Sequence, residues 1–144
     1  MGAVATGGVR VLNEDVVARL RIDPRDLDRV TRAELARLHA REQSYRGDRP
    51  APSITGRVVI LVDDGVATGA TARAALRAVE ALGPTRTVFA VPVGPAGLES
   101  QFADVRVDEV VCPLTPADFD AVGRWYQDFT ATTDREVRGL LGLR

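Results

Sequence analysis

The stretch VVILVDDGVATGATARAALRAV, residues 58–79, decides the fold. Its five consecutive apolar residues predict a buried strand over residues 58–62, with both faces covered. Two aspartates end that strand, and a loop of small residues and hydroxyls follows. Apolar residues then recur at helical spacing, at Ala72, Ala75, Leu76, Val79 and Leu82, before Gly83 and Pro84 end the pattern. The stretch therefore predicts the first half of a βαβ unit.

Two later apolar runs predict strands parallel to the first, over residues 87–93 and 109–114. A short crossover over residues 95–102 would join them. Alternation of strands and helices is typical of α/β proteins. The sequence thus predicts an α/β fold with a mostly parallel sheet, flanking helices and a Rossmann-like core.

Helix signals follow the last predicted strand. Thr115 can cap and Pro116 can open a helix that runs toward Trp125. Thr133 and Glu136 form a capping box, which predicts one more helix at the C-terminal end.

The N-terminal third has a different character. Residues 9–12 predict a strand, and Asn13 is a good cap for a short helix after it. Residues 24–45 are charged, with a narrow apolar seam, and predict a helix that is mostly solvated. Because Thr31 and Glu34 fit a capping box, this segment is predicted as one long helix or as two helices that meet there.

The chain length and the positions of prolines and glycines predict the domain organisation. At 144 residues and 45% apolar composition, the chain is predicted to form a single soluble domain over residues 1–144. Prolines and glycines over residues 47–56 predict an irregular linker. The linker separates an N-terminal strand and helical segment, residues 1–49, from a core over residues 57–144.

Composition excludes several classes of function. With 19 basic and 20 acidic residues interspersed, the chain has no basic stripe that would indicate nucleic acid as a partner. Every basic residue is an arginine, so lysine chemistry is excluded, including the P-loop lysine. No apolar stretch approaches a membrane span, and no signal peptide is apparent. The single cysteine, Cys112, excludes an internal disulfide and fits a cytoplasmic protein.

The residues after the first core strand predict a binding site. In open α/β sheets, ligands bind beyond the carboxyl ends of the strands, where Asp63 and Asp64 emerge. The GVATGAT loop leads into a helix whose first N–H groups and dipole favour an anion such as phosphate. Two carboxylates at this place would repel a phosphate. We therefore expect them to accept hydrogen bonds from sugar hydroxyls and to help to hold a divalent cation. The site suits a sugar phosphate with vicinal hydroxyls.

At this point the sequence resembles a known family. VVILVDDGVATGAT is similar to the phosphoribosyl-pyrophosphate (PRPP) motif of the type I phosphoribosyltransferases, which consists of an apolar strand, two acids and a Thr-Gly-x-Thr loop. GAVATGGVRVLNEDVV and AVGRWYQDF resemble segments of a bacterial subfamily of predicted phosphoribosyltransferases. The resemblance covers most of the chain.

The resemblance implies an activity and a set of site residues. Members transfer the 5-phosphoribosyl group of PRPP to a nitrogenous acceptor, usually a nucleobase, and release pyrophosphate, with Mg²⁺ as cofactor. Asp63 and Asp64 would contact the ribose hydroxyls, hold Mg²⁺ directly or through water, and include the general base. The whole PRPP-binding set would be Asp63, Asp64, Gly65, Val66, Ala67, Thr68, Gly69, Ala70 and Thr71, with the 5-phosphate held by the last five.

One departure from the family pattern leads to further expectations. Members begin upstream with a strand and a loop that holds the pyrophosphate, so we expect an N-terminally incomplete domain. The edge of the strand at residues 58–62 would then be unpaired and favour association of copies into a homo-oligomer. The alternatives to an active transferase are a non-catalytic PRPP-binding or nucleotide-binding module, a truncated inactive homologue, and a structural partner that pairs through this edge.

Several residues have plainer interpretations beside the functional ones. Adjacent acids also occur in response-regulator receivers, but that fold requires a lysine that this chain lacks. His39 is expected on a solvated surface rather than as a base. The arginines of residues 25–49 are expected on a solvated face rather than at a pyrophosphate.

The aromatic and sulfur-containing residues of the core also have two interpretations. Trp125, Tyr126 and Phe129 are expected in the core, with stacking on a base as the alternative. Cys112 is expected as a small buried hydrophobe.

Overall fold

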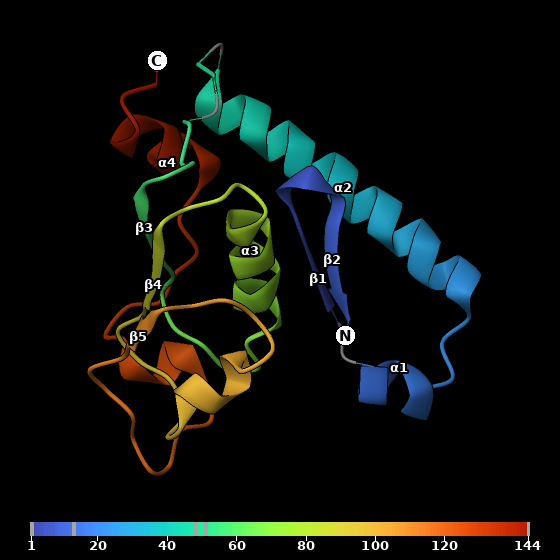
Figure 1. Cartoon of the computed structure of the whole chain (residues 1–144), viewed down its shortest axis with the longest axis vertical. Helices are drawn as coiled ribbons and strands as arrows, with labels where there is room; N and C mark the ends of the chain where they lie inside the picture. The colour runs from blue at the N-terminus through green and yellow to red at the C-terminus, as the bar shows by residue number, and fades with distance from the viewer. Residues whose placement is uncertain (1, 13, 48, 51, 144) are drawn as a thin grey trace.

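A computed structural model describes residues 2–12, 14–47, 49–50 and 52–143. Its main sheet is parallel, with β3 (Val58–Val62), β4 (Arg86–Ala90) and β5 (Glu109–Val111) in the order β3-β4-β5 (Figure 1). The predicted α/β class and its parallel strands are confirmed. The last two strands are shorter than expected, and an isolated bridge between Val93 and Leu114 continues their pairing.

The helix α3 (Ala70–Glu80) covers one face of this sheet. Small residues on α3 allow close packing, and Leu76 is fully buried against the sheet. Phe89 of β4 meets Phe102 edge to face, with ring centroids 5.2 Å apart. Phe102 ends the 3₁₀ helix η2 (Leu98–Phe102), which is the short crossover that the sequence predicted. The core therefore lies between α3, β4 and η2.

The other face of β3 is exposed, which corrects the expectation of a strand covered on both faces. The side chains of Val58, Ile60 and Val62 are exposed at 62%, 63% and 69%. These three side chains alternate with half-buried ones along β3, so they share one face of the strand, and β3 is an edge strand of the sheet. A continuous apolar run shows that a strand can be buried, but the number of covering layers decides whether it is. Association of copies through this edge stays a prediction.

The N-terminal part adds a second, smaller sheet. The strands β1 (Gly2–Ala5) and β2 (Val9–Leu12) form an antiparallel hairpin around the 3₁₀ turn η1 (Thr6–Gly8). The predicted strand over residues 9–12 is confirmed, whereas β1 was not predicted. In the turn between them, Gly7 has a φ of 81°, a conformation that glycine adopts without strain.

Two helices follow this hairpin. The short helix α1 spans Glu14–Arg19, and its predicted cap, Asn13, lies outside the described residues. The helix α2 (Pro24–Arg46) is continuous and is capped by the Asp23 side chain, so the alternative of two helices is excluded. The hairpin lies between α3 and α2 (Figure 1).

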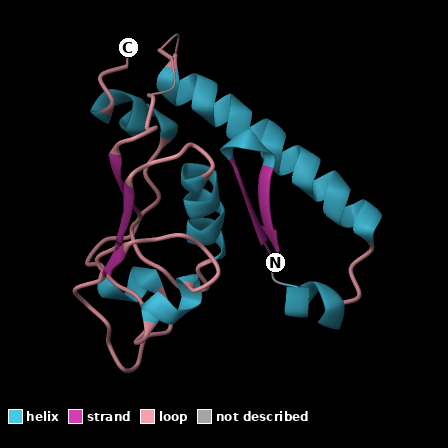
Figure 2. Cartoon of the chain, viewed as in Figure 1, coloured by secondary structure: helices cyan, strands magenta, loops and turns pink. Residues whose placement is uncertain are grey.

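The C-terminal part is mostly loop (Figure 2). The helix expected from Thr115 to Trp125 is wrong, because only a 3₁₀ turn, η3 (Val122–Trp125), forms in that segment. Ala121 is extended, with φ −151° and ψ 145°, so the backbone before η3 cannot continue a helix. The last helix, α4 (Asp134–Leu140), begins at the predicted capping box of Thr133 and Glu136.

None of the helices in the described ranges combines the length and the apolar character that crossing a membrane requires.

Candidate functional site

The acidic turn, defined as Asp63–Gly65, follows directly where β3 leaves the sheet. Its first N–H, from Asp63, donates to the Ala90 carbonyl of β4 at 3.3 Å. The next N–H, from Asp64, donates to the Asp63 carboxylate at 3.0 Å. One oxygen of Asp63 is thus used within the turn, while its other oxygen and both oxygens of Asp64 remain acceptors for a ligand.

Both acids are exposed, as a site for a soluble ligand requires. Partial burial raises the pKa of the Asp64 carboxyl above its ordinary value, and the charge of Asp63 raises it further. The backbone hydrogen bond at Asp64 opposes this shift. Two adjacent carboxylates therefore differ in environment.

The anion loop, defined as Val66–Thr71, links the acidic turn to α3. Val66 is buried, and its N–H donates to the Val93 carbonyl at 3.1 Å, which anchors the start of the loop to the core. Within the described residues, the backbone N–H groups from Ala67 to Thr71 have no hydrogen-bond partner. No side chain caps the helix at Gly69, so these donors and the positive end of the helix dipole are open to an anion.

Two glycines allow the backbone to adopt this shape. A Cβ at Gly65 would lie 2.6 Å from Val122 and 3.0 Å from the Val93 carbonyl oxygen. Gly69 has a φ of 69°, in the left-handed region, and a Cβ there would lie 3.0 Å from Gln101 Oε1. That buried Gln101 oxygen has no hydrogen-bond partner among the described residues. The close packing at both glycines fixes the turn and the loop against the rest of the core.

A C-terminal segment, Val122–Phe129, closes over the acidic turn. The Tyr126 hydroxyl donates to the backbone carbonyl of Asp64 at 2.6 Å. The Tyr126 and Phe129 rings lie 5.0 Å apart, and the Phe129 ring rests against Gly123. Trp125 is half-buried, and its indole nitrogen has no partner among the described residues.

These aromatic residues were predicted in the core, but they lie beside the site instead, and Phe129 is 47% exposed. Sequence reasoning missed the hydrogen bond from Tyr126 to the turn, because 62 residues separate the two partners. The sequence offered one signal: Tyr126 carries a phenolic hydroxyl between two largely apolar aromatic residues, Trp125 and Phe129. This signal does not identify the group that accepts its hydrogen bond.

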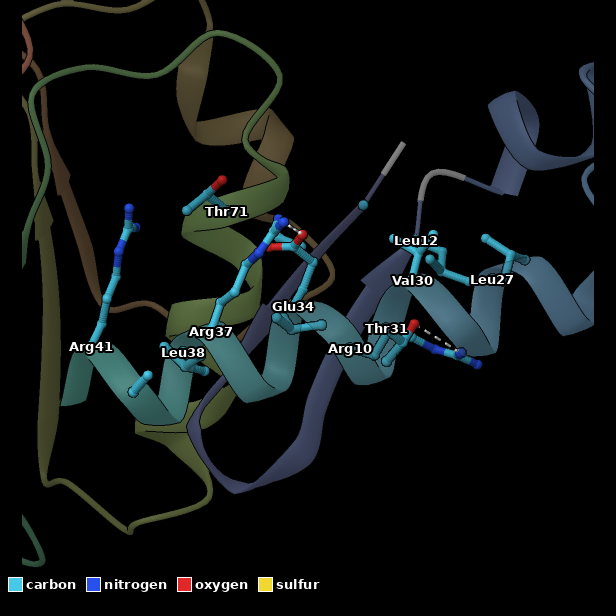
Figure 3. A pocket seen from close by; sticks show the side chains of 14 residues that line it. Arg10, Leu12, Leu27, Val30, Thr31, Glu34, Arg37, Leu38, Arg41 and Thr71 are labelled. Atoms are coloured by element: carbon cyan, nitrogen blue, oxygen red, sulfur yellow. Dashed lines mark hydrogen bonds and ion pairs between the residues drawn. The ribbon is translucent and has the colours of Figure 1, made fainter. Parts of the chain in front are cut away.

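The arginines of α2 mostly form a solvated face, as expected. A cavity of about 720 Å³ lies between α2 and the hairpin and reaches Thr71 of the anion loop (Figure 3). Arg37 at this cavity pairs with Glu34 at 2.6 Å, and Arg10 pairs with Asp28 at 3.1 Å. These pairs are exposed, which limits their strength.

His39 was placed as expected, but the burial expected for Cys112 is only partial. His39 is exposed, with Glu42 as its neighbour at 3.5 Å. Cys112 is half-buried against the core, and this burial raises the pKa of its thiol.

The described residues contain no group of three or more His, Cys, Asp or Glu side chains that could hold a metal ion. A metal at this site would therefore have at most two protein carboxylates, with the remaining ligands from a bound molecule or from water. Mg²⁺ is commonly bound in this way, through one or two carboxylates and substrate phosphates. The donor set fits Mg²⁺ that arrives with a phosphorylated ligand.

Comparison with known proteins gives one consistent picture. The family model of the phosphoribosyl transferase domain matches residues 3–122. Two proteins of Mycobacterium tuberculosis, each called "Putative phosphoribosyl transferase" (Rv0571c of strain H37Rv and MT0597 of strain CDC 1551), are 46% identical over 140 residues. The alignment covers 97% of this chain but only 31% of the length of these relatives.

A solved structure also matches the chain in fold and in sequence. The crystal structure of TT1426 from Thermus thermophilus is 41% identical, with a TM-score of 0.74. The match covers 97% of this chain and 65% of that one.

Proposed function

This chain belongs to the phosphoribosyl transferase family, and on that premise we propose that it binds PRPP and transfers the 5-phosphoribosyl group to a nitrogenous acceptor. The observation that carries the proposal is the row of N–H groups from Ala67 to Thr71, which have no partner among the described residues and come shortly after two exposed carboxylates at the end of β3. This arrangement separates a phosphate-binding region from a hydroxyl-binding region along one short stretch of chain.

In this proposal the 5-phosphate lies in the anion loop. Its oxygens accept hydrogen bonds from the free N–H groups and from the exposed Thr68 and Thr71 hydroxyls. Gly69 adopts the left-handed backbone conformation that this loop requires, and the absence of a Cβ there lets the loop pack against Gln101 and Phe102. No basic side chain is needed at this point, because the helix dipole and the N–H groups supply the positive potential.

The ribose diol lies against the acidic turn. The free oxygens of Asp63 and Asp64 are enough to accept one hydrogen bond from each of the two hydroxyls. Like charges would repel the phosphate, so the acids favour the orientation in which the diol faces them. The two ends of the site thus fix the direction of the sugar.

The reaction breaks the bond between ribose C1 and the pyrophosphate oxygen and forms a bond between C1 and the acceptor nitrogen. The electron pair of the broken bond leaves with the pyrophosphate, and the acceptor N–H proton passes to a base or to water. When bound, Mg²⁺ would neutralise charge on the departing pyrophosphate. The protein contributes mainly position and electrostatic stabilisation of the positively charged ribose, in which the two carboxylates take part.

Asp64 is the better suited of the two candidate bases. Its raised pKa makes its carboxylate a stronger proton acceptor than that of an ordinary aspartate. Asp63 is partly occupied by the N–H of its neighbour, so its role is limited to the diol and to the metal.

Isothermal titration of PRPP with Mg²⁺ tests the proposal. The Asp63→Asn and Asp64→Asn variants should each weaken binding by about ten- to a hundredfold, because each loses a charge-assisted hydrogen bond. Asp26→Asn serves as the matched control, since Asp26 is an exposed residue of α2 that pairs with Arg29 at the surface. Its affinity should stay within about twofold of the unchanged protein.

Turnover is tested separately. Pyrophosphate release with a panel of nucleobases should be measurable for the unchanged protein and should fall strongly in Asp64→Asn. Absence of any PRPP binding at millimolar concentration would refute the proposal. If PRPP binds but no nucleobase of the panel leads to pyrophosphate release, the proposed function would be restricted to that of a PRPP-binding module.

A further inference from the structure

We propose that Tyr126 is a positioning residue that sets the preference of the site for ribose over 2-deoxyribose. The inference rests on the proposed function, since it concerns how the acidic turn meets the sugar diol. It assigns a specific task to a residue that lies outside the PRPP motif and 62 positions away from its partner.

The first step is the contact itself. The Tyr126 hydroxyl donates to the Asp64 carbonyl at 2.6 Å, which fixes the orientation of the peptide between Asp64 and Gly65. Two backbone hydrogen bonds also hold the turn. The Asp63 N–H donates to the Ala90 carbonyl of β4, and the Val66 N–H, just after the turn, donates to the Val93 carbonyl. Tyr126 is the one side chain from a distant segment that hydrogen-bonds to the acidic turn, within the part of the chain that the structure describes.

The second step is the packing that holds Tyr126 in place. Val122, four residues earlier, lies so close to Gly65 that a Cβ there would be 2.6 Å away. The Phe129 ring packs on the Tyr126 ring at 5.0 Å and on the backbone of Gly123. Both ends of the segment are therefore anchored, one on the turn and one on the tyrosine, so the hydroxyl is preorganised for its acceptor.

The third step links the turn to the sugar. The carboxylate of Asp64 and the carbonyl that Tyr126 holds belong to the same residue, so a displacement of the Asp64 backbone that follows loss of this hydrogen bond also moves the carboxylate. A hydroxyl on the ribose is recognised only if the acceptor oxygen lies within hydrogen-bond distance and in line. Loss of the tyrosine hydroxyl would therefore weaken contacts to the diol while leaving the N–H groups of the anion loop in place.

The test compares three ligands: ribose 5-phosphate, 2-deoxyribose 5-phosphate and inorganic phosphate. The unchanged protein should bind ribose 5-phosphate more tightly than its deoxy analogue. Tyr126→Phe should reduce this ratio by about three- to tenfold, the effect of one ordinary hydrogen bond. Affinity for inorganic phosphate should stay within about twofold, which a general loss of structure would not allow.

Tyr45→Phe is the matched control. The chain has two tyrosines, and the Tyr45 hydroxyl also makes a hydrogen bond, to the Asp134 carboxylate between α2 and α4. This variant loses one hydroxyl far from the acidic turn, and its ribose preference should be unchanged.

The outcomes separate the two proposals. A ribose preference that is retained in full in Tyr126→Phe would overturn the role of Tyr126 alone. Equal losses for all three ligands would also overturn it, because they would indicate a structural role. An unchanged protein that binds neither sugar phosphate would overturn the proposed function, and the inference with it.

Discussion

The inner and outer faces of the main sheet both carry apolar side chains, yet only the inner face is buried. On the inner face, Phe89 is fully buried beneath α3, in register with Leu61 and Val110 on the neighbouring strands. On the outer face, Val58, Ile60 and Val62 are mostly exposed. The two faces of the same strand, β3, therefore experience apolar and aqueous surroundings one residue apart.

This difference separates the part of the molecule that supplies most of the stability from the part that carries the candidate site. The inner face supplies the packed core, and the edge where β3 leaves the sheet carries the acidic turn. The outer face contributes little burial, and its apolar row on an edge strand is the kind of surface that favours association. Substitutions on the two faces, and at the edge between them, should consequently have effects of very different size.

The largest effect is expected on the inner face. Phe89→Ala should lower the free energy of unfolding by about 3–5 kcal/mol, because it removes a buried ring and leaves a cavity against Phe102. Urea denaturation followed by circular dichroism measures the loss. Ile60→Ala on the outer face is the comparison, and equal losses for the two variants would contradict the assignment of the faces.

A smaller effect is expected at the edge of the sheet. Gly65→Ala would place a methyl group 2.6 Å from Val122 and 3.0 Å from the Val93 carbonyl oxygen, so the turn must shift. We expect a loss of stability of about 1–3 kcal/mol, together with weaker PRPP binding. Gly139→Ala is the control, since nothing lies within 4 Å of its Cβ position in α4, and it should be neutral or stabilising. Normal PRPP affinity in Gly65→Ala would show that the turn does not need its present shape.

The pH dependence of binding tests the electrostatics of the same edge. Burial and the charge of Asp63 raise the pKa of Asp64, so this carboxyl becomes protonated at a higher pH than an ordinary aspartate. Because the proposed diol contact requires the ionised form, PRPP affinity should fall as the pH decreases, by up to about tenfold per pH unit below that pKa. Titrations with PRPP at a series of pH values measure this fall in affinity. The Asp64→Asn variant should lack the part of the fall that comes from protonation of Asp64.

The same shift has the opposite sign for stability. A pKa raised by folding favours the neutral carboxyl, so its stabilising contribution is present below the pKa of the unfolded chain and is lost as the pH rises through the folded pKa. Binding and folding should therefore respond to Asp64 in opposite directions. A parallel response of both would contradict this cause of the shift.

The smallest effect is expected on the outer face. Ile60→Thr should change the free energy of unfolding by no more than about 0.5 kcal/mol, because the side chain is 63% exposed and threonine keeps the β-branched shape that strands favour. Chemical denaturation of the variant beside Phe89→Ala measures this difference. A loss above about 2 kcal/mol would mean that the outer face is covered in solution.

The local signals in the sequence predicted the elements that local chemistry determines. The bounds of β3, the helix α3, which ends at Glu80 shortly before Gly83 and Pro84, and the capping box of Thr133 and Glu136 all follow from residues close together in the chain. The acids and the anion loop were likewise placed in one region, because they form a single contiguous stretch at the end of a strand.

The features that the sequence did not predict depend on distant partners. The exposed face of β3 depends on how many helices cover the sheet, which no residue of β3 encodes. Pro116 fits the start of a helix, but the backbone from there to Ala121 forms only turns and irregular structure. The contact of Tyr126 with Asp64 joins two segments 62 residues apart, and no periodic pattern in the sequence predicts such a contact. Tertiary packing decided each of these points.

Trp125 has a practical consequence that follows from its place in η3. It is the only tryptophan in the chain, and its half-buried indole is next to the residue that contacts the acidic turn. Intrinsic fluorescence of the unlabelled protein, excited at the indole band, therefore comes from a single position next to the residue that contacts the acidic turn. A change in emission wavelength on adding a ligand would report how tightly the C-terminal segment is docked, without any engineered probe.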